Sequence, residues 1–258
     1  MKARLQTLDR LLRGGFTDPA QLTSSGPRVT IRTLLGFCMA LGALYGVMMG
    51  LFSLLAWEDT GTALLQMLST MVKVPLLFLL TLAITFPSLY VLSALSRTSL
   101  GAEQTAQLLL VAVTVDLALL ASLGPILAFF TLSTESYPFM KLLNVLLFTV
   151  AGIGGLTFLQ RTLAKWFQPS PAEAEGLDSG ELSDAADSLA WRRRKGQEPS
   201  RTRRLFFGWC VLFGVVGAQM GWVLRPFLGD PGQPFALFRE RESNILAQVL
   251  TSLGRLFQ

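Results

Sequence analysis

The sequence predicts an all-α fold: a polytopic transmembrane helix bundle of about five spans, with amphipathic helices at its N- and C-terminal ends. The first observation is composition, because 51% of the 258 residues are hydrophobic, 15% are charged and the mean hydropathy is +0.49. A soluble domain is rarely so apolar. The second is that five apolar stretches reach the roughly 20 residues that a membrane span requires. They are residues 33–57, 72–95, 106–130, 141–163 and 205–224.

Residues 1–32 form a basic segment in which leucines recur at helical spacing. The leucines are Leu5, Leu8, Leu11 and Leu12, and the basic residues among them are Lys2, Arg4, Arg10 and Arg13. The pattern predicts a short amphipathic helix on the cytoplasmic face of the membrane. The alternative is a disordered basic leader.

Spans one to four occupy residues 33–163 and contain Pro75, Pro87 and Pro125. A proline inside a helix removes a backbone donor, so we expect kinks at these positions. The kinks are expected to reflect bent packing and do not by themselves indicate gating.

Residues 164–204 form the only long linker, between spans four and five. Six acidic residues lie between Glu173 and Asp187, and four consecutive basic residues begin at Arg192. Low apolar content with many Pro, Gly and Ser residues predicts a mostly disordered cytoplasmic segment. Its basic run is expected to lie against anionic headgroups, and a docking site for an acidic partner is the alternative.

The tail, residues 225–258, begins where span five (residues 205–224) ends. Pro226, Pro231 and Pro234 prevent the helix from continuing, while phenylalanines keep the segment apolar. We expect this part to lie at the membrane interface or to fold back onto the bundle. After it, residues 243–257 have apolar side chains on one helical face and are too short to span, which predicts an interfacial amphipathic helix.

The distribution of Lys and Arg predicts the orientation of the chain. Sixteen of them fall in the N-terminal segment, between spans two and three, and between Arg161 and Arg204, whereas six fall on the other side. The positive-inside rule then places the N-terminus in the cytoplasm and the C-terminus outside. The expected location is the cell inner membrane, with the lipid bilayer as the first partner.

Two spans carry a stripe of small residues along one helical face. In span one the stripe is Cys38, Gly42, Gly46 and Gly50, and in span five it is Cys210, Gly214, Gly217 and Gly221. Such stripes let two helix backbones approach closely in lipid. Because both spans run outward with the cysteines at matching depth, we expect the two stripes to pack together with Cys38 near Cys210. Self-association through the same stripes is the alternative.

Asp116 is the ionisable residue predicted near the middle of a span, and no basic residue is predicted at its depth. A buried carboxyl group there is unfavourable by roughly 2.5–3.5 kcal/mol, so it marks a functional candidate. It can serve proton-coupled transport, or it can bridge helices by hydrogen bonding to Gln219, Asn144 or a carbonyl freed by Pro75.

Arg225 stands at the outer end of span five, next to Trp222. Its side chain can extend to the headgroups, or it can pair with the acidic residues of the two outer loops. Those residues are Glu58, Asp59 and Glu135.

Several classes of chemistry are not supported by the sequence. There is no histidine, so imidazole catalysis and histidine-ligated metals are excluded, and the two cysteines fall inside apolar spans. Paired carboxylates, phosphate-binding loops and nucleophile elbows are also missing, and "GIGGL" at 152–156 lies inside a span, where it serves packing. We therefore expect no enzyme activity, no cofactor, no metal and no nucleic-acid partner.

The stretch "MGWVLRPFLGDPGQPFALFR", together with five spans and a glycine-bearing last span, resembles small bacterial polytopic membrane proteins and is loosely similar to the Ypt-interacting-protein (Yip) superfamily. The Asp-Leu-Tyr-Gly-Pro stretch usual in that superfamily is missing from the N-terminal segment. The resemblance covers the membrane bundle and implies neither a substrate nor a trafficking role.

These observations favour a non-enzymatic integral membrane subunit or anchor of a membrane assembly. Its expected partners are other membrane subunits or a second copy of the chain. The alternative is a small proton-coupled transporter or channel element that uses Asp116, which would require a cavity beside that residue.

Overall fold

The fold is all-helical over the residues that the computed structural model describes, which are 2–12, 30–57, 59–95, 102–134, 136–166, 207–225, 227–228 and 235–238. The labelled helices are α1 (Lys2–Leu12), α3 (Ile31–Ala56), α4 (Thr60–Leu95), α5 (Ala102–Ser133) and α6 (Tyr137–Trp166). A further helix, Phe207–Val223, follows in the described part of the chain. The predicted fold class, an all-α bundle of about five spans, is confirmed.

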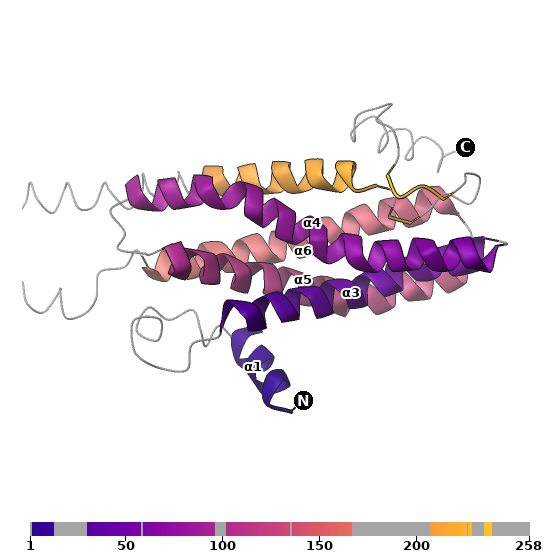
Figure 1. The fold of residues 1–258 in the computed structure, drawn as a ribbon, viewed down its shortest axis with the longest axis horizontal. Coiled ribbons are helices and arrows are strands. Elements are labelled where there is room, and N and C mark those ends of the chain that lie inside the picture. The colour runs from indigo at the N-terminus through magenta and orange to yellow at the C-terminus, as the bar shows by residue number, and fades with distance from the viewer. Residues whose placement is uncertain are drawn as a thin grey trace, which may run out of the picture.

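Four of these helices, α3 to α6, are long and apolar enough to cross a membrane, and the Phe207–Val223 helix is a shorter apolar one. The chain is therefore a multi-pass membrane protein by the length and composition of its helices. In Figure 1 the long helices lie side by side with their axes roughly parallel, and the Phe207–Val223 helix (orange) lies along one side of the bundle.

Helix α4 begins much earlier than the predicted span 72–95, because it starts at Thr60 and runs for 36 residues. The residue before it, Asp59, accepts hydrogen bonds from the backbone N–H groups of Gly61 and Thr62, each 3.2 Å long. A side-chain cap of this kind satisfies donors that the first helical turn leaves free. The predicted outer loop thus becomes the first three turns of α4.

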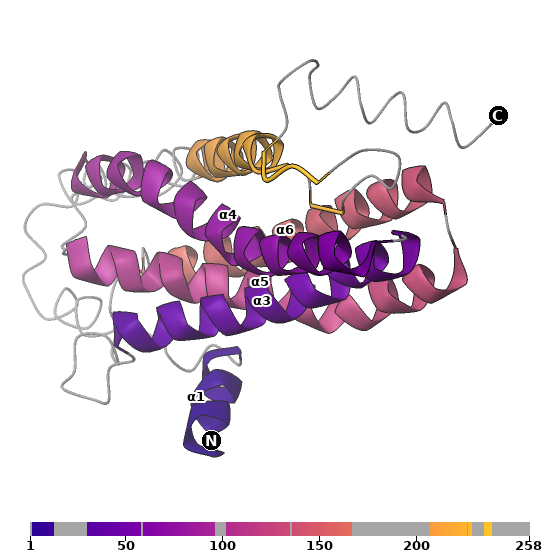
Figure 2. The same cartoon turned by 45° about the vertical axis from the view of Figure 1, so that its right-hand side comes forward.

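Helix α5 lies at the centre of the bundle. It is the most buried of the four long helices and packs along α3 on one side and α6 on the other. Helix α3 also packs closely along α4. Figures 1 and 2 show the resulting order, with the Phe207–Val223 helix beside α4 and α3 on the opposite side of the bundle.

The glycines of α3 bring its backbone against α4. A Cβ atom added at Gly42 would lie 2.8 Å from the Cβ of Pro75, and one at Gly46 would lie 2.7 Å from the Cα of Met71. At Gly50 the closest atom would be the Cγ of Met67, at 2.6 Å. No side chain fits in these gaps, so close helix packing is the reason for the stripe.

The ribbon of α4 is bent, and Pro75 and Pro87 lie inside this helix. Each proline removes one backbone hydrogen bond, which lets a helix bend there. Pro75 also lies against Gly42 and fills the gap left by this glycine of α3.

The Phe207–Val223 helix packs on the other face of α4. An added Cβ would be 3.6 Å from Thr81 at Gly217 and 3.6 Å from Leu77 at Gly221, and these are ordinary contact distances. The indole Nε1 of Trp209 donates a hydrogen bond to Oγ of Ser88 at 3.1 Å. Helix α4 therefore lies between the two glycine-bearing helices.

The chain after this helix folds back onto α4. This is one of the two arrangements that the sequence predicts for the tail. The carbonyl of Phe227 accepts hydrogen bonds from Oγ1 of Thr70 at 2.6 Å and Nε2 of Gln66 at 3.0 Å. Further along, Nζ of Lys73 donates to the carbonyl of Leu237 and lies 5.3 Å from the centre of the Phe238 ring. The predicted amphipathic helix at 243–257 lies outside the described residues.

Helix α1 confirms the short N-terminal helix expected from the leucine spacing, and it contacts α5. Leu11 is fully buried there, whereas Leu12 is exposed. The predicted linker 164–204 lies outside the described residues except for its first three, which extend α6 to Trp166.

Candidate functional site

Asp116 lies on the central helix α5, and its side chain is 7% exposed. It packs directly against Gly155 of α6, where an added Cβ would lie 2.9 Å from the Cβ and 3.0 Å from the Cγ of Asp116. Glycine at 155 therefore makes room for the carboxyl group, in agreement with the packing role expected for the "GIGGL" stretch.

One oxygen of this carboxyl group, Oδ1, is buried and has no hydrogen-bond partner within the described part of the chain. The predicted bridge to Asn144 is not formed. Instead, Oδ1 of Asn144 accepts a 2.7 Å hydrogen bond from Tyr45, and its Nδ2 lies 3.4 Å from the sulfur of Met49. Gln219, the other predicted partner, is exposed on the Phe207–Val223 helix. Asp116 thus lacks the bonds expected of a helix bridge through these residues.

A cavity of about 490 Å³ lies beside Asp116, and Asn144 also contributes to its wall. Its other walls come from α4, α6 and the Phe207–Val223 helix. The wall is mostly aliphatic and aromatic, and Asp116 is the titratable residue among the described lining side chains. The rings that line the cavity are Phe78, Phe148, Trp209, Phe213 and Phe227.

The predicted pairing of the two small-residue stripes is wrong. The α3 stripe faces α4, and so do Gly217 and Gly221, whereas an added Cβ at Gly214 would meet nothing within 4 Å. The α3 stripe marks a close approach of two backbones, whereas Gly217 and Gly221 make ordinary contacts with side chains of α4, on the other face of that helix. The sequence pattern shows where a backbone comes close and does not show which helix supplies it.

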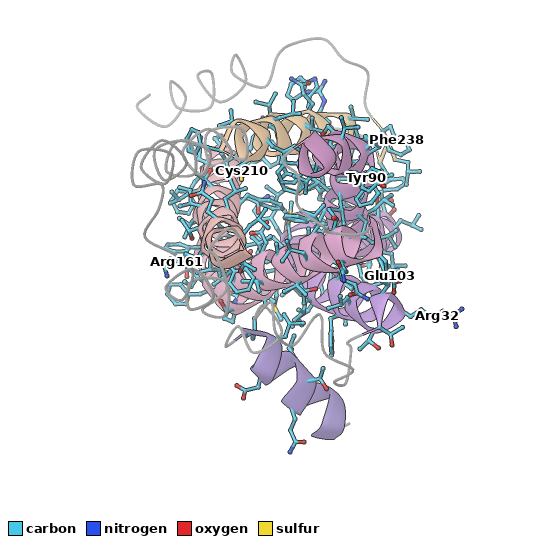
Figure 3. The ribbon with its side chains drawn as sticks, turned by 90° about the vertical axis from the view of Figure 1, so that its left-hand side faces the viewer. Arg32, Tyr90, Glu103, Arg161, Cys210 and Phe238 are labelled. Atoms are coloured by element: carbon cyan, nitrogen blue, oxygen red, sulfur yellow. The ribbon has the colours of Figure 1, made fainter. Side chains whose placement is uncertain are left out.

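The cysteines are separated in the same way. Sγ of Cys38 lies 3.3 Å from Oγ1 of Thr114 on α5, and both Cys38 and Cys210 are free thiols in buried positions. Cys210 belongs to the helix that packs on the far side of α4 from α3 (Figure 3). Their expected proximity is therefore not found.

Just after the Phe207–Val223 helix, the guanidinium carbon of Arg225 lies 3.7 Å from the centre of the Trp222 ring, a cation–π contact. Of its predicted partners, Glu58 and Glu135 lie outside the described residues. Asp59 caps α4, and its carboxylate also accepts a hydrogen bond from the Thr62 hydroxyl. The hydrogen bonds from the Thr62 side chain and from the Gly61 and Thr62 amides hold the pKa of Asp59 below its ordinary value.

Three residues that the sequence reasoning did not single out hold the tail on the bundle: Gln66, Thr70 and Lys73. They recur at spacings of four and three, so they share one face of α4. Lys73 is 4% exposed within α4. The missed signal is Asp59 followed by Thr60, a typical helix N-cap that indicates the true start of α4.

Among the described residues, no group of three or more Cys, Asp or Glu side chains is arranged so as to hold a metal ion. No family model matches the chain, and neither does any curated protein or solved structure.

Proposed function

We propose that the chain is a non-enzymatic transporter element of a membrane, with Asp116 as the group that takes up and releases a proton. The main support is the Asp116 carboxyl group in the wall of a cavity of about 490 Å³, with one buried oxygen unpaired among the described residues. The sequence alone favoured a subunit or anchor, and the cavity is the observation that changes this preference.

The physical argument concerns the cost of an unpaired carboxyl group in a membrane, which is roughly 2.5–3.5 kcal/mol on insertion scales. A purely structural aspartate recovers part of this cost through hydrogen bonds to neighbouring helices. Asn144 is bonded to Tyr45 instead, and Gln219 is exposed. A carboxyl group left available inside a cavity is what proton-coupled transport requires.

The surroundings of Asp116 contain no second titratable group among the described side chains that line the cavity from α4, α5, α6 and the Phe207–Val223 helix. Its protonation is thus governed by whatever enters the cavity rather than by a neighbouring acid or base. This supports an element with one proton site rather than a relay of several.

The test is water access to position 116. We would introduce Asp116→Cys into a chain with Cys38 and Cys210 replaced by alanine, reconstitute it in liposomes, and apply a membrane-impermeant, charged thiol reagent from each side. A transporter element predicts labelling from at least one side. Leu120→Cys is the matched control, because Leu120 is on the same helix, is fully buried and does not line the cavity.

Labelling of Leu120→Cys should be absent. If Asp116→Cys is as unreactive as Leu120→Cys from both sides, the carrier role is wrong and Asp116 is structural.

A second candidate, a membrane subunit that associates with another copy of the chain, has one observation in its favour. The polar amide of Gln219 is exposed on the Phe207–Val223 helix, and Ala218 beside it is exposed too. A hydrogen bond from a lipid-facing polar side chain to a partner helix stabilises the association by roughly 1 kcal/mol. This role predicts that Gln219→Leu lowers the oligomeric state seen by native mass spectrometry from mild detergent.

We propose the orientation with the N-terminus in the cytoplasm and the C-terminal tail outside, in an inner membrane. Arg32 is at the start of α3 and Arg161 is near the end of α6, and these two helix ends lie at the same end of the bundle, on the left in Figure 1, which supports placing that end inside. Glu103 at the start of α5 belongs to the same end, but acidic residues contribute little to the rule. Accessibility of single cysteines in the tail of intact cells would test this orientation.

A further inference from the structure

The chemistry of the cavity wall restricts what can occupy it. Its volume of about 490 Å³ falls in the range of sites that hold an organic molecule, roughly 300–1,000 Å³. Five aromatic side chains contribute to the wall, as described above, and a single acidic side chain lies among them. The described lining residues include neither Lys nor Arg. The charge that complements this site is therefore positive.

The entrance to the cavity lies on the side of the bundle. On α6, the lining residues Val145 and Ile153 are exposed, and on the Phe207–Val223 helix Gly214 and Ala218 are exposed as well. The lining residues of α4 and α5, by contrast, are buried. Within the described part of the chain, the cavity thus opens between α6 and the Phe207–Val223 helix, on a flank that faces lipid when the bundle is in a membrane.

A molecule that enters by this route must first dissolve in the bilayer. A strongly hydrated inorganic cation does not do so, and neither does a polar metabolite. A cation whose charge is covered by apolar or aromatic groups does dissolve in the bilayer, and it can then contact the aromatic rings of the cavity wall.

We propose that the cavity is a binding site for a lipophilic organic cation that enters from the bilayer between α6 and the Phe207–Val223 helix. The carboxylate of Asp116 pairs with the positive charge, and the aromatic rings of the wall contact the apolar body. Binding of one monovalent cation releases one proton from Asp116 to water, so the net charge of the occupied cavity is unchanged. This proposal rests on the proposed transporter role of Asp116 and adds the class of its substrate.

The role of Gly155 follows from the same geometry. Because glycine at this position lets the carboxyl group pack against the α6 backbone, the Asp116 side chain stays at the cavity wall and leaves the volume free. Gly155 is a positioning residue for the site.

The test uses tetraphenylphosphonium, a lipophilic cation, and triphenylphosphine oxide, a neutral molecule of related shape, with the purified full chain in detergent. Equilibrium dialysis measures the binding of each probe. We expect Asp116→Asn to weaken binding of the cation about tenfold or more and to leave binding of the neutral probe unchanged. Asp59→Asn is the matched control, because Asp59 is an exposed carboxylate outside the cavity, and it should change neither affinity.

A second variant tests the cavity itself without removing the carboxyl group. Gly214→Leu adds a side chain at the cavity wall where a new Cβ meets nothing within 4 Å, so the helix can accept it. It should weaken both probes. Gly208→Leu, on the same helix, also meets nothing within 4 Å and does not line the cavity, so it should leave both unchanged.

Equal binding of tetraphenylphosphonium to wild type and to Asp116→Asn, or no binding to wild type, would overturn the proposal. The outcome is distinct from that of the labelling experiment. If position 116 is water-accessible but the cation does not bind, the transporter role stands and its substrate is of another class. If the cation binds but Asp116→Cys is not labelled from either side, the binding site is supported and the proton-coupled transport role is wrong.

Discussion

The phenolic hydroxyl of Tyr45 on α3 donates a 2.7 Å hydrogen bond to Oδ1 of Asn144 on α6, and both side chains are buried. Both helices pack against the central helix α5, so this bond is a direct link between two helices that α5 otherwise connects. The same bond gives Asn144, which the sequence suggested as a hydrogen-bond partner of Asp116, a different partner.

Tyr45→Phe should therefore destabilise the bundle by roughly 0.6–1.7 kcal/mol, the range for a hydrogen bond between membrane helices. The ring contact with Phe148, with centroids 5.6 Å apart, is retained in this variant. Unfolding in mixed detergent micelles measures the change. Thr157→Val is the control: its exposed hydroxyl bonds only the carbonyl of Gly154 within its own helix, and its effect should be much smaller.

Gly46→Ala should separate α3 from α4. The added Cβ would lie 2.7 Å from the Cα of Met71 and 2.8 Å from the carbonyl oxygen of Thr70, and backbone atoms cannot move aside as a side chain can. We expect a loss of stability of about 1–3 kcal/mol or failure to assemble. Gly36→Ala in the same helix meets nothing within 4 Å and should be neutral or slightly stabilising. Equal behaviour of the two variants would contradict the packing described for α3.

Gly155→Ala should disturb the Asp116 carboxyl group, since the new methyl carbon would lie 2.9 Å from the Cβ of Asp116. Binding of tetraphenylphosphonium should weaken by roughly tenfold as the carboxyl group is displaced. Gly152→Ala is the matched control, because Gly152 also lines the cavity but has open space at its Cβ position. Its effect on binding should be smaller. An equal effect of both substitutions would indicate that cavity volume, and not the position of Asp116, determines binding.

Lys73→Met should release the tail from α4. The substitution removes the hydrogen bond to the carbonyl of Leu237 and the contact with the Phe238 ring. Faster amide hydrogen exchange in a peptide covering residues 235–238 is the expected result, measured by mass spectrometry. Lys141→Met, which removes the same charge from α6, is expected to leave exchange in that peptide unchanged.

Asp59 makes the stability of the N-terminal end of α4 depend on pH. Hydrogen bonds from Thr62 and Gly61 lower its pKa in the folded state, so the unfolded state binds its proton more readily. The stabilisation is therefore complete above the unfolded pKa, about 4, and is lost as the pH falls through the lower folded pKa. Asp59→Asn should remove this dependence while keeping the cap, whereas Asp59→Ala should lose the cap at every pH. Detergent unfolding from pH 7 to pH 3 measures both, and identical pH profiles of wild type and Asp59→Asn would refute the assignment.

The helical fold could be predicted because long apolar runs in a membrane have few alternatives to helices. The predicted span begins at residue 72 and α4 begins at Thr60. Hydropathy alone leaves out residues 60–71, because they are less apolar than a typical span. Asp59 and Thr60 contained the missing information, but as a capping signal rather than as hydropathy.

The candidate site was predictable only in part. Asp116 stood out because a carboxyl group in a span is costly, and that argument needs no neighbours. The cavity beside it could not be predicted, since it is the space left by four helices whose arrangement the sequence does not specify. The same limit explains the two glycine stripes, which were expected to meet and instead lie on opposite faces of α4.

The position of the Phe207–Val223 helix also matters during synthesis. Helices α3 to α6 leave the ribosome first, and the cavity beside Asp116 lacks the wall formed by the Phe207–Val223 helix until that helix docks on α4. A chain that stopped before Phe207 would retain the central packing of α5 but would leave its acidic side chain facing the bilayer. Docking of the last helix is therefore the step that completes the wall of the cavity around Asp116.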